Sequence, residues 1–299
     1  MKDFSHGFLY GAIAGDIAGS PYEHCRAPRT INSYARPLFA PASRFTDDTV
    51  LTLAVAEGLI EGGGDPQKTP SALIASIRRL ALLYPNAGYG VRFKLWLRSE
   101  DPRPYNSFGN GSAMRVSPAG WFFDSLPQTE RFAEIAAAVT HNHPEGIRGA
   151  CAAASGIFLA RTGASAEDIR SYITGRYGYD LSGSFEAFRA SARPSVTCMD
   201  TLPIAFMSFL SSDSFEDALR RAISFGGDTD TQAAIAGSLA EAYWGVPGPV
   251  REAARSRLPQ PLLSILDRAA ATKPGGLSAP AREKDAPRPP RPDKGRPQP

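Results

Sequence analysis

Apolar residues recur at three- and four-residue spacing along most of the chain, which is the period of α-helices with one buried face. Turn-forming Gly, Pro and Asn residues separate these runs at 62–66, 84–88 and 101–104. No series of alternating strand-like segments and no strand–helix alternation is present. The pattern therefore predicts an all-α protein. The clearest helical runs are Phe8–Ala18, Val50–Ile60, Ala72–Leu83, Arg131–Val139, Ile147–Leu159, Leu202–Leu210, Ala218–Phe225 and Ala233–Trp244.

No change of composition divides the helical region, so we predict a single compact domain over residues 1–271. With 42% apolar and 21% charged residues, the chain can bury a substantial core. Residues 272–299 are rich in Pro, Arg and Gly and contain one large aliphatic side chain, Leu277, which predicts a disordered tail. The tail holds seven basic and three acidic residues. It therefore accounts for the net charge of +3, which does not indicate a nucleic-acid-binding face. A solvated terminus is favoured over a basic arm for an anionic partner.

The sequence also gives an expectation for cellular location. No apolar stretch approaches the roughly 20 residues that cross a bilayer, and the N-terminus lacks the basic and apolar regions of a secretory signal. The three cysteines, Cys25, Cys151 and Cys198, are widely spaced and match neither a metal-ligand pattern nor a disulfide framework. We therefore predict a cytoplasmic protein that does not associate with a membrane.

The first helical run carries Gly11, Gly15 and Gly19 at four-residue intervals. Such a smooth face permits close approach of another helix. Helix dimerisation in a membrane is the alternative interpretation of this spacing, but Asp16 in the middle of the run argues against it. We predict a tightly packed helix beneath the functional site.

Two short clusters of acids and hydroxyls, Thr46–Thr49 and Asp228–Thr231, each open an alanine-rich run. Either could be an ordinary helix N-terminus, with Thr46 or Asp228 as the capping residue. A cap needs one acceptor, however, and each cluster supplies at least three oxygens. Oxygen ligands of this kind suit hard cations such as Mg²⁺, Mn²⁺ or Ca²⁺. If the two clusters meet in the fold, they form a site able to hold two divalent ions.

Two further features are candidates for ligand contact. The segment 106–115 is a loop of small residues running into a predicted helix, and its glycines would let backbone N–H groups approach an anion such as a phosphate. The same segment is also compatible with a simple turn. His141 and His143 follow a helical run. His141 either contacts a ligand or interacts with the free carbonyls at a helix end.

Together these motifs resemble the ADP-ribosylglycohydrolase family, which includes dinitrogenase reductase-activating glycohydrolases and ADP-ribosyl-acceptor hydrolases. The resemblance extends from about Gly7 to Val246. It rests on five segments in consistent order: Gly15–Glu23, Phe45–Thr49, Ser107–Arg115, Thr140-His141 and Gly226–Thr231. It implies a compact domain of orthogonally packed helices, with two Mg²⁺ or Mn²⁺ ions as cofactors, that hydrolyses the glycosidic bond between ADP-ribose and an acceptor.

The resemblance also implies roles for individual residues. The metal ligands would be Thr46, Asp47, Asp48, Asp228, Asp230 and Thr231. A loop of Ser107, Phe108, Gly109, Asn110, Gly111 and Ser112 would cradle the diphosphate, and His141 would help to hold the ADP-ribose. Hydrolysis of a glycosidic bond needs an activated water among anionic groups. We expect Asp47 or Asp48 to be the catalytic base, assisted by Glu23.

Two other functions were considered. A phosphatase of the haloacid dehalogenase type could use 228–231 as a nucleophile motif, but the preceding glycines and the following helical run do not match its strand context. A protein that binds ADP-ribosylated partners without turnover is the non-enzymatic alternative, and the intact acids disfavour it. The partner is expected to be an ADP-ribosylated substrate, with nucleic acid involved only if the acceptor is a base. The irregular segments 26–43 and 163–199 are expected to line the acceptor side.

Overall fold

The computed structural model describes residues 7–23 and 36–277. Within these ranges the chain forms 14 α-helices and two short 3₁₀-helices, and its one β-bridge joins Gly109 to Thr197. This confirms the predicted all-α fold. The α-helices are α1 (Tyr10–Gly19), α2 (Asp47–Gly62), α3 (Thr69–Leu83), α4 (Val91–Arg98), α5 (Ser117–Phe122), α6 (Leu126–Ala138), α7 (Pro144–Thr162), α8 (Ala166–Tyr177), α9 (Phe185–Ser191), α10 (Cys198–Leu210), α11 (Phe215–Ile223), α12 (Thr229–Trp244), α13 (Gly248–Arg255) and α14 (Gln260–Thr272). The 3₁₀-helices are η1 (Ser20–Tyr22) and η2 (Asn110–Ser112).

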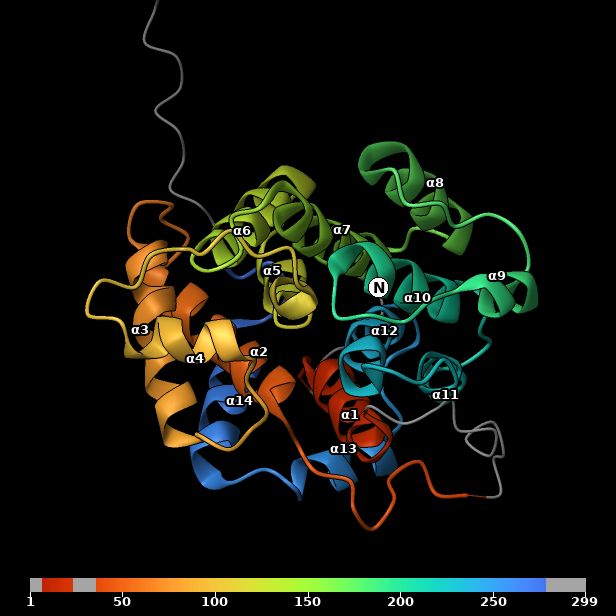
Figure 1. Ribbon diagram of the computed structural model, residues 1–299, viewed down its shortest axis with the longest axis horizontal. Helices are drawn as coiled ribbons and strands as arrows, with labels where there is room; N and C mark the ends of the chain where they lie inside the picture. The colour runs from red at the N-terminus through yellow and green to blue at the C-terminus, as the bar shows by residue number, and fades with distance from the viewer. Residues whose placement is uncertain (1–6, 24–35, 278–299) are drawn as a thin grey trace, which may run out of the picture.

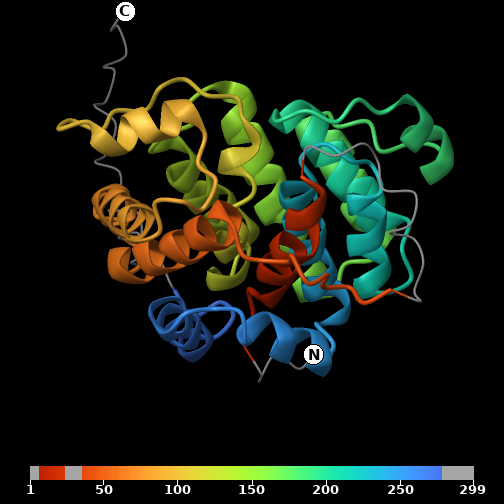
Figure 2. The same cartoon turned by 60° about the horizontal axis from the view of Figure 1, so that its bottom comes forward.

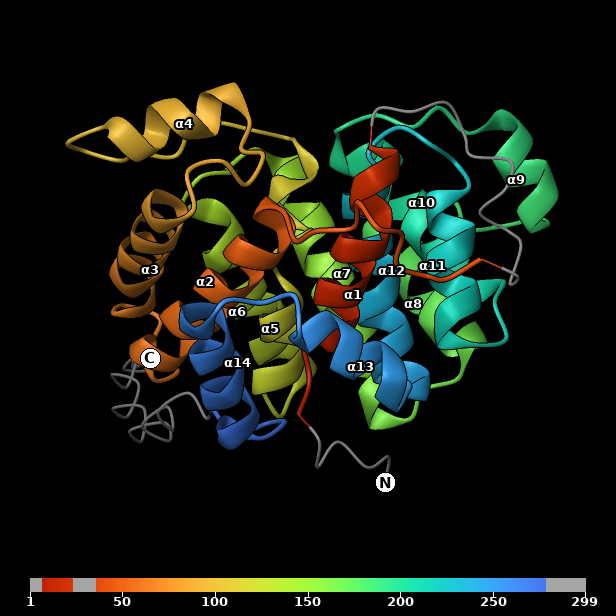
Figure 3. The same cartoon turned by 90° about the horizontal axis from the view of Figure 1, so that it is seen from below.

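Helices α1 and α12 lie side by side in the middle of the molecule (Figure 3). A Cβ atom on Gly11 would lie 2.2 Å from the carbonyl oxygen of Gly237, and one on Gly15 would lie 2.0 Å from that of Ala233. No larger side chain fits at these positions, which confirms the predicted close approach along the glycine face. The pairing fixes α1 against the helix that begins with the second acidic cluster.

The other helices surround this central pair. Helices α2, α3 and α14 lie on one side, and α9, α10 and α11 lie on the other (Figures 1 and 3). Figure 2 shows α4, in gold, and α9, in green, at opposite ends of the molecule. The main hydrophobic core extends across the molecule and includes Phe8, whose ring stacks on that of Trp121 with their centroids 4.9 Å apart. No helix of the described residues is long and apolar enough to cross a membrane.

The segment 163–199 is not the irregular connection expected from the sequence, because it contains α8 and α9. Helix α8 begins with a capping box between Ser165 and Asp168 and ends at Gly178, whose φ is 71°. Its buried side chains Ile169, Ile173 and Tyr177 recur every four residues. This short apolar stripe among many polar residues is a weak helical signal, so local capping decides the helix more than its hydrophobic period does.

The helical region extends slightly beyond the boundary predicted at residue 271. Helix α14 continues to Thr272, and the backbone N–H groups of Gly275 and Leu277 then donate to the carbonyl oxygens of Trp121 and Phe122, at 2.8 and 2.9 Å. These bonds attach 273–277 to α5. The remaining part of the predicted tail, 278–299, lies outside the described residues, as does the part 26–35 of the predicted rim segment.

Candidate active site

A buried carboxylate on α1 organises the first acidic cluster. The side chain of Asp16 is fully buried and accepts the backbone N–H of Thr46 at 2.8 Å and that of Thr49 at 3.1 Å. The hydroxyls of the same two threonines also donate to it, that of Thr46 at 2.7 Å. Asp16 therefore ties the first turn of α2 to α1. From the sequence, Asp16 argued against a membrane helix and was part of the Gly15–Glu23 motif, but it was given no role at the site. The signal that could have identified it was a single acid inside the apolar helical run 8–18.

Thr46 confirms the capping interpretation of the first cluster. It is the N-cap of α2, and its hydroxyl oxygen accepts the backbone N–H of Asp48 at 3.3 Å. The backbone N–H of Asp47 donates to the carbonyl oxygen of Ala87 at 2.9 Å. Gly88, with φ of 125°, leaves room for the Asp47 carboxylate, because a Cβ there would lie 2.7 Å from its Oδ1. The predicted turn at 84–88 thus supports the start of α2.

The second cluster is built on a two-glycine turn. Gly226 and Gly227 have φ of 72° and 76°, and α12 begins two residues later at Thr229. Asp228 occupies the N-cap position, but its side chain makes no capping hydrogen bond, so the capping interpretation was wrong for this residue. Its carboxylate instead accepts the side-chain N–H of Asn110 at 2.6 Å. Asp228 is thereby held toward the glycine-rich loop.

The structure brings the two clusters together. The hydroxyl of Thr231 donates to Oδ2 of Asp48 at 3.2 Å. One carboxylate oxygen from each of Glu23, Asp228 and Asp230 lies within 4.8 Å of the other two. Glu23 directly follows η1, which continues from α1. Residues from α1, α2 and α12 therefore converge on one acidic centre beside the central helix pair.

The electrostatics of this centre are unfavourable without a cation. Among the described residues, no Lys or Arg pairs with the five aspartates of the centre, which are Asp16, Asp47, Asp48, Asp228 and Asp230. Oδ1 of Asp48 is buried without a hydrogen-bond partner. A buried acceptor in this condition costs free energy unless a ligand satisfies it. The donor set thus fits a hard, oxygen-preferring cation.

Burial and mutual repulsion raise the carboxyl pKa values. Burial, followed by the charges of Asp16 and other nearby acids, raises the pKa of Asp47 to about 7. Burial and then the charge of Asp230 raise the pKa of Asp48 well above its ordinary value, and burial and then Asp228 do the same for Asp230. Burial raises the pKa of Asp16 to about 6, opposed by its hydrogen bonds from the threonines. A bound cation would reverse these shifts.

The predicted substrate loop borders the acidic centre, although two of its side chains are already engaged. Asn110 donates both to Asp228 and, at 3.0 Å, to the hydroxyl of Thr201. Ser112 is fully buried and donates to the carbonyl oxygen of Gly146 at 2.7 Å. Ser107 is partly exposed and accepts the backbone N–H of Gly109 at 3.2 Å. Backbone contacts to the segment 196–198 hold the other side of the loop.

Two histidines lie next to the predicted substrate loop. A Cβ on Gly111 would lie 3.1 Å from Nε2 of His141, so glycine at this position lets the loop backbone approach the ring closely. The Phe108 side chain is 43% exposed and lies edge-on to His143. His143 itself caps α7 by accepting the backbone N–H of Glu145 at 3.1 Å. His141 is therefore the histidine that the fold places beside the glycines of this loop.

These features define an all-helical protein with a buried acidic centre able to hold hard cations, next to a glycine-rich loop. The chain matches the family model for ADP-ribosylglycohydrolase over residues 2–276 and belongs to that family. It is therefore a hydrolase of glycosidic bonds that acts on ADP-ribosyl groups, as the family resemblance implied.

Characterised relatives have the same class of activity in their names. ADP-ribosylhydrolase ARH3 of Homo sapiens is 26% identical over 315 aligned residues, which cover 80% of this chain and 85% of the relative. ADP-ribosylarginine hydrolase Tri1 of Pseudomonas putida (strain GB-1) is 28% identical, with 82% and 72% covered. The ADP-ribosyl-[dinitrogen reductase] glycohydrolase of Rhodospirillum rubrum is also 28% identical, with 82% and 87% covered.

A solved structure described as an ADP-ribosylglycohydrolase-related protein complex has a similar fold. The TM-score is 0.63 at 25% sequence identity, and the match covers 90% of this chain and 98% of the other.

Proposed function

We propose that this protein is a binuclear-metal-dependent hydrolase that releases ADP-ribose from an acceptor and so reverses ADP-ribosylation. The acceptor is a protein side chain, a nucleic-acid base or a small metabolite. The observation that carries the proposal is the convergence of acids from α2 and α12 on a centre whose five aspartates pair with no Lys or Arg among the described residues. We further expect the enzyme to work in the cytoplasm, on an ADP-ribosylated substrate.

The ligands in this proposal are those predicted from the sequence. Two Mg²⁺ or Mn²⁺ ions would be held by Thr46, Asp47, Asp48, Asp228, Asp230 and Thr231. Two observations support this set. Oδ1 of Asp48 has no hydrogen-bond partner, and one carboxylate oxygen of Asp228 lies within 4.8 Å of one of Asp230. The hydroxyl of Thr46 already donates to Asp16, so its oxygen is oriented by that bond. When bound, the ions would orient the ribose hydroxyls and lower the pKa of a bound water.

The chain's own residues would then carry the proton and the substrate. Asp47 or Asp48 would accept a proton from the attacking water at a carboxylate oxygen, with Glu23 assisting. Developing positive charge on the ribose would be stabilised by the surrounding carboxylates. The loop from Ser107 to Ser112 would hold the diphosphate, and the exposed ring of Phe108 is available to a flat group of the ligand.

The decisive experiment measures release of free ADP-ribose from arginine-linked, serine-linked, base-linked and small-molecule conjugates. Each conjugate is incubated with Mg²⁺, with Mn²⁺ and with EDTA. We expect release from one linkage class, dependent on the cation. Full turnover in EDTA would disprove the metal mechanism, and no release from any conjugate with either ion would disprove the proposed activity. Asp230→Asn serves as the inactive control.

A further inference from the structure

A buried chain of hydrogen bonds connects Arg115, Thr140 and His141 behind the substrate loop. We propose that Arg115 and Thr140 are positioning residues, which hold His141 as a neutral imidazole whose Nε2–H donates to the diphosphate of the substrate. The ligand in this proposal rests on the proposed function. The hydrogen-bond chain itself rests only on the arrangement of the three side chains.

The hydrogen-bond chain begins at Arg115, whose side chain can donate hydrogen bonds but cannot accept them. Nη2 of Arg115 donates to Oγ1 of Thr140 at 2.6 Å and to the carbonyl oxygen of Ala136 at 3.2 Å. A guanidinium group has N–H donors and no acceptor. The Thr140 oxygen is therefore the acceptor in this bond, and its own proton remains to be placed.

The second bond fixes that proton. Thr140 is fully buried, and Nδ1 of His141 lies 2.6 Å from its hydroxyl oxygen. Among the described residues, His141 is the only acceptor within reach of the Thr140 hydroxyl. A buried hydroxyl proton without an acceptor would cost free energy, so it points at Nδ1. Nδ1 then accepts, and a neutral imidazole in that condition carries its proton on Nε2.

The opposite ring nitrogen faces the place where an anion would lie. A Cβ on Gly111 would lie 3.1 Å from Nε2 of His141, and one on Gly109 would lie 3.7 Å from it. Because both residues are glycines, the ring nitrogen lies close to the loop backbone with no side chain between them. The described part of the chain offers Nε2 no acceptor. An Nε2–H donor is therefore aimed at the loop predicted to hold the diphosphate.

Both the charge and the burial of the surroundings favour the neutral ring. Burial, followed by the charges of Arg115 and Arg92, holds the pKa of His141 well below its ordinary value. Burial lowers the pKa of Arg115 to about 10, so its guanidinium stays charged at neutral pH. Arg92 lies over the Tyr105 ring, which in turn lies 5.6 Å from the His141 ring. Among the described residues, no carboxylate forms a hydrogen bond or an ion pair with His141.

The charge of Arg115 also contributes to anion binding. Its Nε and Nη1 are buried without hydrogen-bond partners, and no described carboxylate pairs with it. An uncompensated buried cation is costly for stability. A diphosphate bound at the loop, which ends shortly before Arg115 in the chain, would offset part of this cost.

The first test is the ring tautomer in the free protein. Long-range ¹H–¹⁵N spectra distinguish Nδ1–H, Nε2–H and imidazolium forms, and the chain has only four histidines. The His141→Gln variant assigns the signals. We expect wild type and Thr140→Ser to show Nε2–H at pH 7. Thr140→Val should show a mixture of the two neutral tautomers. An Nδ1–H or imidazolium ring in the wild-type protein would overturn the proposal without any reference to activity.

The second test is binding of ADP-ribose in the presence of Mg²⁺ by titration calorimetry. We expect Thr140→Val to bind about tenfold more weakly, since a hydrogen bond to a charged group is lost in part, and Thr140→Ser to restore binding. Thr129→Val is the matched control, because Thr129 is equally buried but its hydroxyl has no partner. If Thr140→Val fails to fold, Thr140→Ala takes its place.

The two tests separate the possible failures. Wild-type protein with the Nε2–H tautomer but no ADP-ribose binding would contradict the proposed function and the ligand named here. Equal affinities for Thr140→Val, Thr129→Val and wild type would overturn the positioning role even if the enzyme is active.

Discussion

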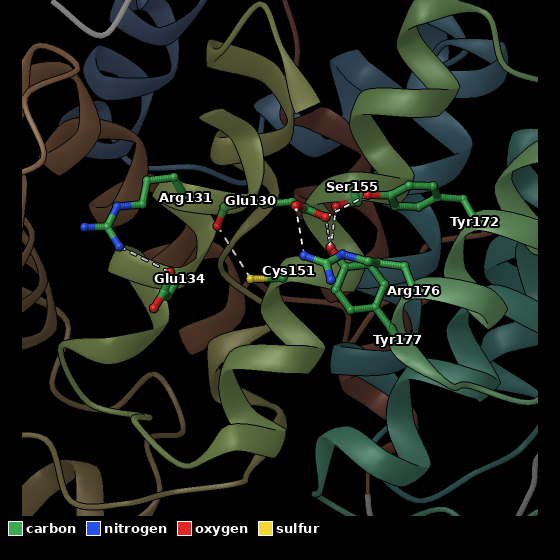
Figure 4. Close-up of polar contacts among 8 residues, drawn as sticks. All are labelled: Glu130, Arg131, Glu134, Cys151, Ser155, Tyr172, Arg176 and Tyr177. Carbon is green, nitrogen blue, oxygen red and sulfur yellow. Dashed lines mark hydrogen bonds and ion pairs between the residues drawn. The ribbon is translucent and has the colours of Figure 1, made fainter. Parts of the chain in front are cut away.

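The acidic centre and a second group of acids, around Glu130 on α6, use the same residue type in opposite ways. Glu130 accepts the hydroxyls of Tyr172 at 2.8 Å and Tyr177 at 2.5 Å, and it pairs with Arg176 at 3.6 Å (Figure 4). Ser155 lies 2.8 Å from the Tyr177 hydroxyl in the same network. These side chains come from α6, α7 and α8, so the network ties three helices together.

The pKa values of the two groups move in opposite directions. Burial alone would raise the pKa of Glu130, but the hydrogen bonds from Tyr177 and Tyr172 and the charge of Arg176 outweigh it, and the pKa lies below its ordinary value. At the acidic centre, burial and like charges act together on Asp48, and its pKa is raised. A carboxylate surrounded by hydrogen-bond donors and a cationic side chain stabilises the fold. A carboxylate surrounded by other acids is unfavourable in its charged form unless a cation binds to it.

Among the tests of this contrast, neutralising one acid of the acidic centre should have the largest effect on activity. Asp48→Asn should reduce ADP-ribose release by about 10³-fold, since it removes a candidate base and ligand. Its melting temperature in EDTA should equal or exceed that of wild type, because repulsion with Asp230 is relieved. Parallel activity and thermal unfolding measurements check both. Glu130→Gln is the control, and it should retain activity. A lower melting temperature for Asp48→Asn in EDTA would contradict the distinction.

Adding cations should stabilise the protein through the acidic centre alone. Mn²⁺ at 100 times its dissociation constant should raise the free energy of unfolding by about 2.7 kcal/mol. Thermal unfolding of EDTA-treated protein with increasing Mn²⁺ measures this shift. The Asp48→Asn/Asp230→Asn variant should lose it, and a Glu130→Gln/Glu134→Gln variant should keep it. An equal shift in both double variants would place the cations elsewhere.

Asp16 is an intermediate case, because it has four hydrogen-bond donors and also lies next to the unpaired acids. Asp16→Asn places an amide N–H against these donors and should cost about 1–3 kcal/mol of stability. It should also weaken Mn²⁺ binding, since α2 is no longer held in place. Urea unfolding and Mn²⁺ titration test the two effects. A variant with unchanged stability would show that the threonines find other acceptors.

The smallest expected effect is the pH dependence of the Glu130 network. Its folded-state pKa is lowered, so the unfolded state binds the proton more readily. The network therefore stabilises the protein above the ordinary pKa of 4.5, and this stabilisation is lost as the pH falls below that value. Because the ion pair with Arg176 is partly exposed, the gain is at most about 1 kcal/mol. Chemical unfolding of wild type and Glu130→Gln at pH 7 and pH 4 should show a stability difference that shrinks on acidification.

Much of the fold and part of the site followed from local sequence patterns. The helical runs, the turns and the glycine face of α1 depend on residues close together in the chain, and each was predicted. Helices α8 and α9 lie in a segment that was expected to be irregular, because their apolar stripes are short, and α4, α13 and α14 were not among the predicted runs. In the sequence, Asp16 is a single acid in an apolar run, and Glu130 stands directly before Arg131, where a predicted helical run begins. Neither role could be assigned, because each depends on the residues that other helices bring near.

By itself, the sequence determined which segments are helical and where acids and hydroxyls are concentrated, because helix periodicity and capping act over a few residues. Only the tertiary structure decided which of these acids are neutralised. Thr231 donates to Asp48 across 183 positions in the chain, and Asn110 donates to Asp228 across 118. Hydrogen bonding and repulsion depend on distance in space, which the packing of α1 against α12 sets.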